Sequence, residues 1–422
     1  MSLRGATVVV ALAAALPRLG VVLHEREAIL SGLTEKSDRF AVTLVESGTL
    51  GFLPGRPSAY TQPLYAWFLS ALYWALERHW LVVGGAQILV AVATALIVHR
   101  IGLLIGTPRT ALAAAVIATL EPFHLWHDVH TNREVLDGLL AAAIAYAVLW
   151  TLRRRSLAGA LATGLLAGVA ILGNARLTVL PILLAVVVAW GLPWRRALAH
   201  GAVLVVAAAV AVTPWVVRNA VVVGCATITT DARALWKANN ENTYGILARG
   251  LWIDNVPEPP NGPPWPELAA DRTLAGTPTE VDECAQARYY RGLVTDFWRD
   301  HPGEKAKLAA QAMGMLWSPQ FTTEVQDPDM GSAARFARSV VQPAWVIAIY
   351  VLALMGAFRA RRQFLVLAVS LLAYQTAAAA IFAGTVRYRA PWDFLLVLLA
   401  APVIVAVLDR IRRRSRREPG MA

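Results

Sequence analysis

The stretch Val82-Val-Gly-Gly-Ala-Gln-Ile-Leu-Val-Ala-Val-Ala-Thr-Ala-Leu-Ile-Val98 determines which class of fold this chain adopts. It carries no charged residue, and a single glutamine is its most polar side chain. An α-helix rises about 1.5 Å per residue, so a run of this length crosses most of a hydrocarbon layer about 30 Å thick. The stretch therefore predicts a helix that spans a membrane.

Similar apolar blocks occur along the whole chain. They lie near residues 6–23, 62–76, 82–98, 110–120, 135–151, 157–173, 177–192, 198–217, 340–357, 363–383 and 391–408. Hydrophobic residues make up 57% of the 422 residues and charged residues only 16%, whereas a soluble globular protein has roughly 25% charged residues. This composition excludes a soluble enzyme, a secreted disulfide scaffold and a disordered chain. We expect an all-α polytopic membrane protein.

The basic residues are distributed as in a membrane protein. The net charge is +11, and 35 of the 39 basic residues are arginines, since only four are lysines. Many lie in short runs between the apolar blocks, at Arg100 and Arg109 and at residues 153–155, 195–196, 359–362 and 410–417. Such runs are retained in the cytoplasm. The pattern argues against a nucleic-acid partner.

The N-terminus also belongs to the cytoplasmic side, because Arg4 precedes the first apolar block. This block resembles a signal peptide, and cleavage is one interpretation of it. The many later spans favour an uncleaved first helix.

One block, residues 62–76, conflicts with this topology. If it crossed the membrane, every later basic loop would lie outside. The block is short, begins with Pro63 and carries aromatic side chains such as Trp67 and Trp74, which suit a membrane interface. We therefore expect an outer juxtamembrane helix here, about ten transmembrane helices in total, and both termini in the cytoplasm.

The predicted topology divides the chain into three parts. Residues 1–218 form an N-terminal transmembrane module with outer loops at 24–81 and 121–134. Residues 219–339 form one larger extracytoplasmic loop region, and residues 340–422 form the C-terminal transmembrane helices with a basic cytoplasmic tail. We expect a multi-pass protein of the cell membrane (plasma or inner), with its active site on the extracytoplasmic face.

The two cysteines of the sequence, Cys225 and Cys284, both fall in the 219–339 region. An oxidising outer face favours a disulfide between them. The alternative is that they are two unrelated small apolar residues.

The first outer loop contains a candidate catalytic acid, Asp38, near the start of a predicted helix. A turn-rich loop follows and leads to Tyr60 and Gln62, which are candidate substrate contacts. An acid at a helix start can also serve only as a cap or as a partner of the helix dipole. Both interpretations of Asp38 stay open at this point.

The second outer loop is unusually polar. It contains two candidate catalytic acids, Asp128 and Glu134, and three histidines at every third position: His124, His127 and His130. Two of these histidines could share a divalent metal ion on one helical turn, although the spacing matches no standard zinc signature. The alternative is that they are interfacial residues bonded to solvent and backbone.

Arginines at the outer boundary are candidate ligands of a phosphate group. Arg387 and Arg389 lie in a tight outer turn, against the positive-inside bias, and Arg218 lies at the outer end of another block. Guanidinium groups suit phosphate because they can donate two parallel hydrogen bonds. The alternative is that they reach toward lipid headgroups. Arg18 and Arg176 occupy similar outer positions.

An outer carboxylate and several arginines suit one reaction in particular. In a sugar joined to a lipid phosphate, the leaving phosphate needs only positive charge to hold it. The incoming hydroxyl or amine needs one carboxylate base. The donor lipid enters between helices, so the reaction requires no soluble nucleotide site, and the sequence contains neither a phosphate-binding loop nor a dinucleotide fingerprint.

Five stretches together resemble the GT-C superfamily of polytopic glycosyltransferases, in particular the bacterial protein O-mannosyltransferase and lipid A aminoarabinose transferase group. They are Asp38-Arg-Phe-Ala with residues 48–65, Thr131-Asn-Arg-Glu134, residues 164–176, Thr213-Pro-Trp-Val-Val-Arg-Asn219 with Leu235-Trp-Lys-Ala-Asn-Asn240, and Arg387-Tyr-Arg-Ala-Pro391. Each motif alone is weak. Their order and topology across nearly the whole chain are specific for the superfamily but not for a substrate.

The resemblance implies a GT-C-like fold and an inverting transfer of a sugar from a polyprenyl-phosphate carrier on the outer face. It places the catalytic acid at Asp38, a second acid at Glu134 with Asp128 nearby, and the phosphate-binding arginines at Arg387 and Arg389. Many members have an Asp-Glu pair at the catalytic position, whereas here Arg39 follows Asp38. This departure argues against a metal or a second acid in that loop.

The sequence leaves the sugar and the acceptor open. A hexose or a pentose fits as the sugar, and a glycan, a lipid or a protein fits as the acceptor. Gln62, Asn239 and Asn240 can read substrate hydroxyls or can satisfy backbone groups. Two other functions also stay open: a transporter or flippase of lipid-linked sugars, which often shows inverted repeats that are not evident here, and a non-catalytic envelope assembly protein.

Overall fold

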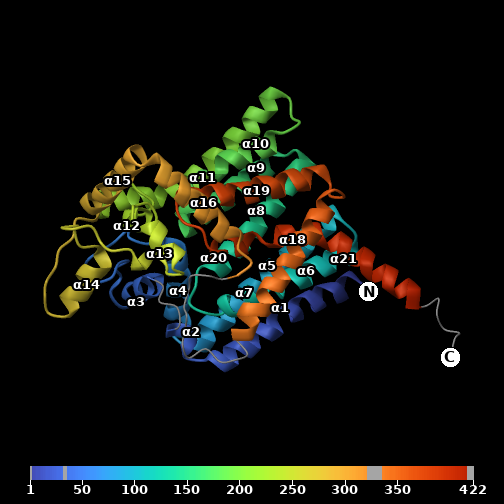
Figure 1. The fold of residues 1–422 in the computed structure, drawn as a ribbon, viewed down its shortest axis with the longest axis horizontal. Helices are drawn as coiled ribbons and strands as arrows, with labels where there is room; N and C mark the ends of the chain where they lie inside the picture. Colours follow the sequence, from blue (N-terminus) through green and yellow to red (C-terminus); the bar gives the residue numbers. More distant parts are fainter. Residues whose placement is uncertain (1, 32–35, 321–334, 416–422) are drawn as a thin grey trace.

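The computed structural model describes residues 2–31, 36–320 and 335–415, and the last residues of the predicted basic tail, 416–422, lie outside these ranges. Within them the protein consists of helices and the loops between them, with one isolated bridge between Leu53 and Arg56 (Figure 1). The protein is therefore all-α, as the composition predicts.

Among the described residues, seven helices are long and apolar enough to cross a membrane. They are α1 (Leu3–Glu25), α5 (Trp80–Ile105), α8 (Glu134–Arg154), α11 (Trp194–Val222), the continuous segment Ala337–Ala357 that ends in α18 (Gln342–Ala357), α19 (Arg362–Ile381) and α21 (Phe394–Ser415). The other three predicted spans form shorter helices, α6 (Pro108–Thr119), α9 (Leu157–Gly173) and α10 (Leu180–Ala189). A helix therefore occurs at each of the ten predicted spans, although three of these helices are shorter than a full span. The structure confirms an all-α polytopic membrane protein.

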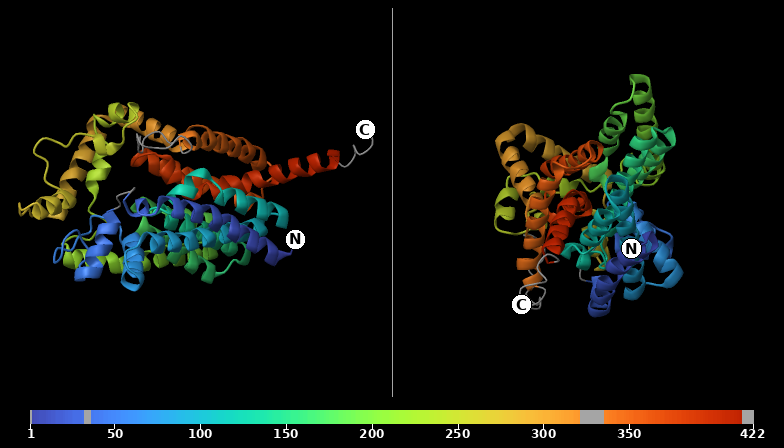
Figure 2. Two further views of the ribbon diagram at one scale, coloured as in Figure 1. Left: turned by 90° about the horizontal axis from the view of Figure 1, so that it is seen from below. Right: turned by 90° about the vertical axis from the view of Figure 1, so that its right-hand side faces the viewer.

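The block that conflicted with the charge pattern forms α4 (Pro63–Leu76), which starts with proline at its first turn. Its 14 residues extend for about 21 Å, too short for a full crossing. It packs against the short helix α3 (Lys36–Ser47) rather than lying within the bundle. Both helices lie at the end of the molecule opposite the N- and C-termini (Figures 1 and 2).

The same end carries a cap of short helices (Figure 1). They are α12 (Ala232–Lys237), α13 (Thr243–Ala248), α14 (Pro266–Leu274), α15 (Glu283–Asp300) and α16 (Pro302–Trp317). The cap begins later than expected, because α11 continues to Val222 instead of ending near residue 218. Part of the predicted outer region, residues 321–334, lies outside the described ranges. A disulfide between Cys225 and Cys284 joins the end of α11 to the start of α15.

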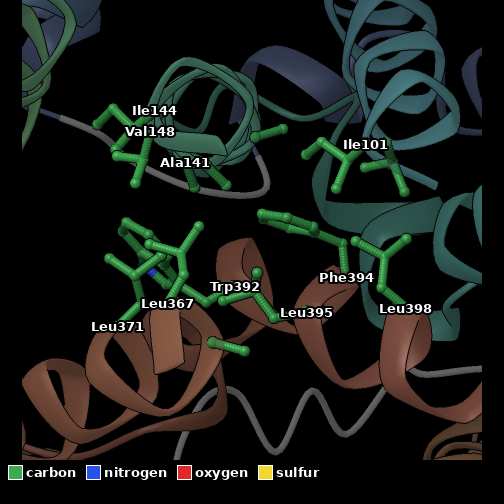
Figure 3. Packing of buried hydrophobic residues seen from close by; sticks show 14 of the residues in the cluster. Ile101, Ala141, Ile144, Val148, Leu367, Leu371, Trp392, Phe394, Leu395 and Leu398 are labelled. Atoms are coloured by element: carbon green, nitrogen blue, oxygen red, sulfur yellow. The ribbon is translucent and has the colours of Figure 1, made fainter. Parts of the chain in front are cut away.

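The core of the bundle forms where α21 meets α5, α8 and α19 (Figure 3). Trp392, just before α21, lies beside Leu367 of α19, and Phe394 of α21 lies on the side of Ile101 of α5. All are buried among other aliphatic side chains. This packing fixes the outer end of α21, and with it the short outer turn that contains the predicted arginines.

Small residues let two helices approach each other at backbone distance. A Cβ atom at Gly164 of α9 would lie 2.2 Å from the Leu204 carbonyl oxygen of α11, and one at Gly168 would lie 2.6 Å from the Ala208 carbonyl oxygen. Such small-residue contacts are how helices associate in a bilayer, where lipid tails are as apolar as leucine. Substitution by alanine is therefore excluded at both positions unless the helices move apart.

Candidate functional site

Asp38 lies in the first turn of α3, and its side chain points to α4 and to the link between α4 and α5 rather than capping its own helix. The Tyr73 hydroxyl donates to Asp38 Oδ1 at 2.5 Å. The Arg78 guanidinium donates to the same carboxylate through Nε at 3.2 Å and through Nη2 at 2.9 Å. The acid is therefore held at both oxygens in a fixed orientation.

Arg78 is a site residue that the sequence reasoning missed. It follows α4 and precedes α5, so the two helices position it over Asp38. Its hydrogen bond to Asp38 raises the pKa of Arg78 above the ordinary value, against the lowering effect of burial. Nothing in the sequence marks the pair, because the two residues are 40 positions apart.

Asp128 belongs to a second, deeply buried network between α1 and the turn after α7 (Pro122–His127). Arg18 of α1 donates to Asp128 Oδ2 through Nε at 3.0 Å and through Nη2 at 2.7 Å. His124 Nδ1 lies 3.1 Å from Asp128 Oδ1, and its Nε2 lies 3.0 Å from the Ala390 carbonyl oxygen. The network thus ties α1 to both the second outer loop and the last outer turn.

The charges in this network shift both titrating groups. Burial lowers the pKa of His124, but the charge and the hydrogen bond of the adjacent Asp128 carboxylate outweigh burial, and the pKa rises to about 9. Burial raises the pKa of Asp128, but His124 and Arg18 together outweigh burial, and the pKa falls to about 2. At neutral pH the three groups therefore form a buried cation–carboxylate–cation cluster.

A narrow cavity of about 40 Å³ borders this network. Its polar wall includes the Glu121 side chain, which caps α7 by accepting a hydrogen bond from the His124 amide at 2.8 Å. Burial raises the pKa of Glu121. Apolar residues of α5, α8 and α21 form the deeper wall.

The three histidines of the second outer loop do not converge on one point. His127 stacks on Phe123, and His130 stacks on Trp126, with ring centroids 3.6 and 3.7 Å apart. Their Nδ1 atoms contact the carbonyl oxygens of the same two aromatic residues. Among the described residues, no group of three or more His, Cys, Asp or Glu side chains is arranged to hold a metal ion.

Glu134 begins α8 and forms an ion pair with Arg387 of the short outer helix α20 (Val386–Arg389). The structure thus joins a predicted second acid to a predicted phosphate ligand that is 253 positions away. The neighbouring Arg133 donates to Gln62 Oε1 at 3.1 Å. Gln62 therefore links the start of α4 to this pair.

Arg389 and Arg218, the other two predicted phosphate ligands, contact mainly protein groups. Arg389 is fully buried, binds Asp393 through Nε at 3.1 Å, and donates to the carbonyl oxygens of Leu316 and Ser318. Arg218 donates to the Ser58 carbonyl at 2.9 Å and, more weakly, to the Leu50 carbonyl at 3.3 Å. Both arginines hold loops in place.

Asn239 and Asn240, two of the predicted substrate-binding residues, are buried and bond mostly to backbone. This is the alternative role that the sequence left open, in which they satisfy backbone groups. Asn239 Nδ2 donates to the Leu235 and Ile381 carbonyls, and its Oδ1 accepts from Trp298 and Lys305. Asn240 Nδ2 donates to the Trp236 carbonyl at 2.9 Å. The fourth candidate, Tyr60, is also buried, with Lys36 over its ring at 4.5 Å.

Asp38 and Glu134 lie toward opposite ends of α4. Asp38 accepts from Tyr73 near the end of the helix. Near its start, the Tyr65 hydroxyl accepts from the amide of Asn132, whose side chain in turn accepts from the Glu134 amide. Tyr65 and Tyr73 are eight residues apart, about 12 Å along the helix axis. The structure therefore forms two separate acid–arginine pairs, one toward each end of α4.

The arrangement of helices is similar to that of solved membrane proteins. The archaeal oligosaccharyltransferase AglB from Archaeoglobus fulgidus, in complex with an inhibitory peptide and a dolichol-phosphate, is 12% identical with a TM-score of 0.52. The match covers 99% of this chain and 52% of AglB, so the chain spans about half of AglB. This similarity shows that the arrangement of helices in this chain resembles that of AglB.

ArnT from Cupriavidus metallidurans gives weaker matches. Bound to undecaprenyl phosphate, ArnT is 16% identical with a TM-score of 0.46, over 96% of this chain and 78% of ArnT. In the apo state, ArnT is 17% identical with a TM-score of 0.42, over 95% of this chain and 77% of ArnT. No protein-family model matches the sequence, and no curated protein matches it.

Proposed function

We propose that this protein is a membrane glycosyltransferase that moves a hexose or a pentose from a polyprenyl-phosphate carrier to an acceptor on the extracytoplasmic face. The GT-C fold supports this class of function. Both termini lie at the end of the molecule opposite α3, α4 and the cap (Figure 2). With the basic loops in the cytoplasm, the acid–arginine pairs then lie on the outer side.

The observation that carries the proposal is the ion pair between Arg78 and Asp38. Their side chains are 39% and 19% exposed, whereas those of Arg18 and Asp128 are only 2% and 8% exposed. A substrate can therefore reach this carboxylate. It offers a base and a cation side by side, which is what transfer from a lipid phosphate requires.

The proposed step uses Asp38 as the general base. The Asp38 carboxylate takes the proton of an acceptor hydroxyl, and the acceptor oxygen attacks the anomeric carbon from the face opposite the phosphate. The bond between the anomeric carbon and the phosphate oxygen breaks, its electron pair stays on that oxygen, and the configuration inverts. Arg78 shares its charge between the carboxylate and the negative charge that develops.

Arg387 is the proposed ligand of the lipid phosphate at the other end of α4. Its present partner is Glu134, so an arriving phosphate competes with that carboxylate for the guanidinium group. Glu134, with Asp128 behind it in the buried network, then acts as the second acid of the site. Arg389 and Arg218 support the phosphate site by holding the adjacent loops.

The acceptor is proposed to approach from the cap side. Tyr60 and Gln62 flank the path between the first outer loop and α4, and Gln62 bonds to Arg133 next to Glu134. A glycan, a lipid or a protein acceptor fits this position. Asn239 contributes by anchoring the cap to α19, and Asn240 contributes by a bond within the cap, to α12.

The test is sugar transfer in membranes that carry the wild-type protein, supplied with a panel of radiolabelled polyprenyl-phosphate sugars and a membrane extract as the source of acceptors. We expect label to move to an acceptor from one of the carriers. Label that only crosses the membrane, still attached to its carrier, would instead identify a flippase. No transfer, hydrolysis or translocation with any carrier would favour an assembly protein.

A further inference from the structure

Arg176 is an outer arginine that the proposed reaction does not yet use. It lies in the short turn η1 (Ala175–Leu177) between α9 and α10, and the Asn174 side chain accepts a hydrogen bond from its amide at 3.3 Å. Its guanidinium group stacks on Tyr388, with Cζ 3.7 Å from the ring centroid. Nη2 donates to the Ala383 carbonyl oxygen at 2.7 Å. These contacts place the group against the last outer turn.

The other two nitrogens of this guanidinium group, Nε and Nη1, are buried and have no hydrogen-bond partner among the described residues. Burial lowers the pKa of Arg176 to about 10, so the group is still charged at neutral pH. A buried charge without a counter-charge is costly, and a buried N–H without an acceptor adds to that cost. Arg18 differs in this respect, because its Nε, Nη1 and Nη2 atoms all donate to protein oxygens.

The charged groups nearest to Arg176 leave one positive charge in excess. Arg133 repels Arg176, and Asp137 attracts it. Asp137 accepts a hydrogen bond from Asn174 at 3.1 Å and lies 4.0 Å from Arg133 Nε. When the Arg387–Glu134 pair is included, the group contains three arginines but only two carboxylates. The arginines are Arg133, Arg176 and Arg387, and the carboxylates are Glu134 and Asp137. The balance favours binding of one further anion.

The turn that contains Arg176 borders an exposed apolar face of the bundle. Val179 and Ile182, just after η1, are each 58% exposed. They belong to the start of α10, an apolar helix of the bundle, so this face contacts lipid. A phosphate attached to a lipid chain can therefore approach Arg176 sideways without passing through the cap.

We propose that Arg176 binds the phosphate of the lipid-linked donor through Nε or Nη1, beside the helix α20 that carries Arg387. Each of these N–H groups can donate a charge-assisted hydrogen bond to a phosphate oxygen. Tyr388 keeps the guanidinium plane in place, and the Ala383 carbonyl fixes its rotation. This assignment rests on the proposed function, and it adds Arg176 to Arg387 as a phosphate contact.

The test measures equilibrium binding of radiolabelled undecaprenyl phosphate to the purified full-length protein in nanodiscs. Unlabelled undecaprenol and phosphatidylglycerol serve as competitors. We expect Arg176→Gln to weaken binding at least about tenfold and Arg176→Lys to weaken it less, because lysine keeps the charge but loses the planar group that stacks on Tyr388. The matched control is Arg362→Gln, whose guanidinium group also stacks on an aromatic ring, Trp190, at 5.6 Å. It should bind like the wild type.

The outcomes separate this assignment from the proposed function. If the wild type prefers undecaprenyl phosphate to undecaprenol but Arg176→Gln binds equally well, the Arg176 site is wrong and the proposed function stands. If the wild type shows no such preference, both fail. If phosphatidylglycerol competes as well as undecaprenyl phosphate does, the site binds a lipid headgroup and the donor assignment is overturned. Unfolding midpoints of both Arg176 variants show whether a loss of binding reflects a loss of folding.

Discussion

Arg78 and Asp38 form a two-point ion pair in which Nε and Nη2 of the arginine bind the two carboxylate oxygens at 3.2 and 2.9 Å. The pair orients the acid, and it also ties up the oxygens that would accept a proton. An acceptor hydroxyl that binds Asp38 must therefore share the carboxylate with Arg78.

Replacement of Asp38 by asparagine tests the base directly. Asp38→Asn keeps the size of the side chain and its hydrogen bond with Tyr73, so we expect a folded protein. Transfer should fall by about 10²–10⁴-fold, the usual contribution of a general base. The matched control is Asp271→Asn, which removes another ion-paired carboxylate, the partner of Arg39 at 2.6 Å. Wild-type turnover by Asp38→Asn would refute the assignment.

The Arg387–Glu134 pair predicts a contrast between stability and activity. Arg387→Gln leaves Glu134 buried without its counter-charge, which should destabilise the protein by about 3–5 kcal/mol. The double variant Arg387→Gln, Glu134→Gln should recover most of that loss, as read from the unfolding midpoint. Transfer should stay low in both. Recovered transfer in the double variant would mean that Arg387 serves only to neutralise Glu134.

Stability should depend on pH through His124 and Asp128. The folded pKa of His124 is raised from 6.5 to about 9, so its contribution is complete below pH 6.5 and is lost as the pH rises through 9. The folded pKa of Asp128 is lowered from 3.8 to about 2, so its contribution is complete above pH 3.8 and is lost as the pH falls through 2. The plateau therefore extends from about pH 4 to 6.5.

The measurement is the unfolding midpoint of the wild type and of His124→Asn between pH 5 and 10. The difference between them should be constant up to about pH 6.5 and should shrink toward pH 9. The exposed His301→Asn should follow the wild-type profile. A difference that does not change with pH would rule out the charged pair.

The disulfide should stabilise the cap. It closes a loop between positions 59 residues apart, for which the chain-entropy model gives about 4 kcal/mol. We expect reductant to increase tryptic cleavage within residues 225–284 of the wild type. The double variant Cys225→Ser, Cys284→Ser should be cleaved at that higher rate with or without reductant. Equal protection in all samples would show that packing alone holds the cap.

The orientation in the membrane can be tested with single cysteines, because the two native ones are bonded and do not react. Glu241→Cys lies in the cap, and Pro193→Cys lies in the loop between α10 and α11. An impermeant maleimide added to intact cells should label the first and not the second. The reverse pattern would place the acid–arginine pairs in the cytoplasm.

Most of the helical architecture could be predicted from the sequence, because each span is recorded locally as a run of apolar residues. The conflict between the basic loops and residues 62–76 also identified α4 as a helix apart from the bundle. Helix ends were less predictable. The apolar block before the cap stops near residue 217, but the helix continues through Arg218 and Asn219 to Val222, because these polar side chains bond to neighbouring loops.

The site was less predictable than the fold, because its pairs join distant parts of the chain. Asp38, Glu134 and Arg387 could be singled out by type and position, but no pattern indicated that Arg78 would pair with Asp38. Asn239 looked like a substrate contact for a similar reason. Only the fold brings the Ile381 carbonyl and the Lys305 ammonium group to its side chain.

The backbone contact between α9 and α11 has a mechanical consequence for the outer arginines. Gly164 and Gly168 leave no space in which one helix could slide or turn against the other. We therefore expect the two helices to move as one rigid unit, with Arg176 just beyond the end of α9 and Arg218 near the end of α11. If the bundle opens to admit the proposed lipid donor, we therefore expect the two guanidinium groups to move together relative to the turn that contains Arg387.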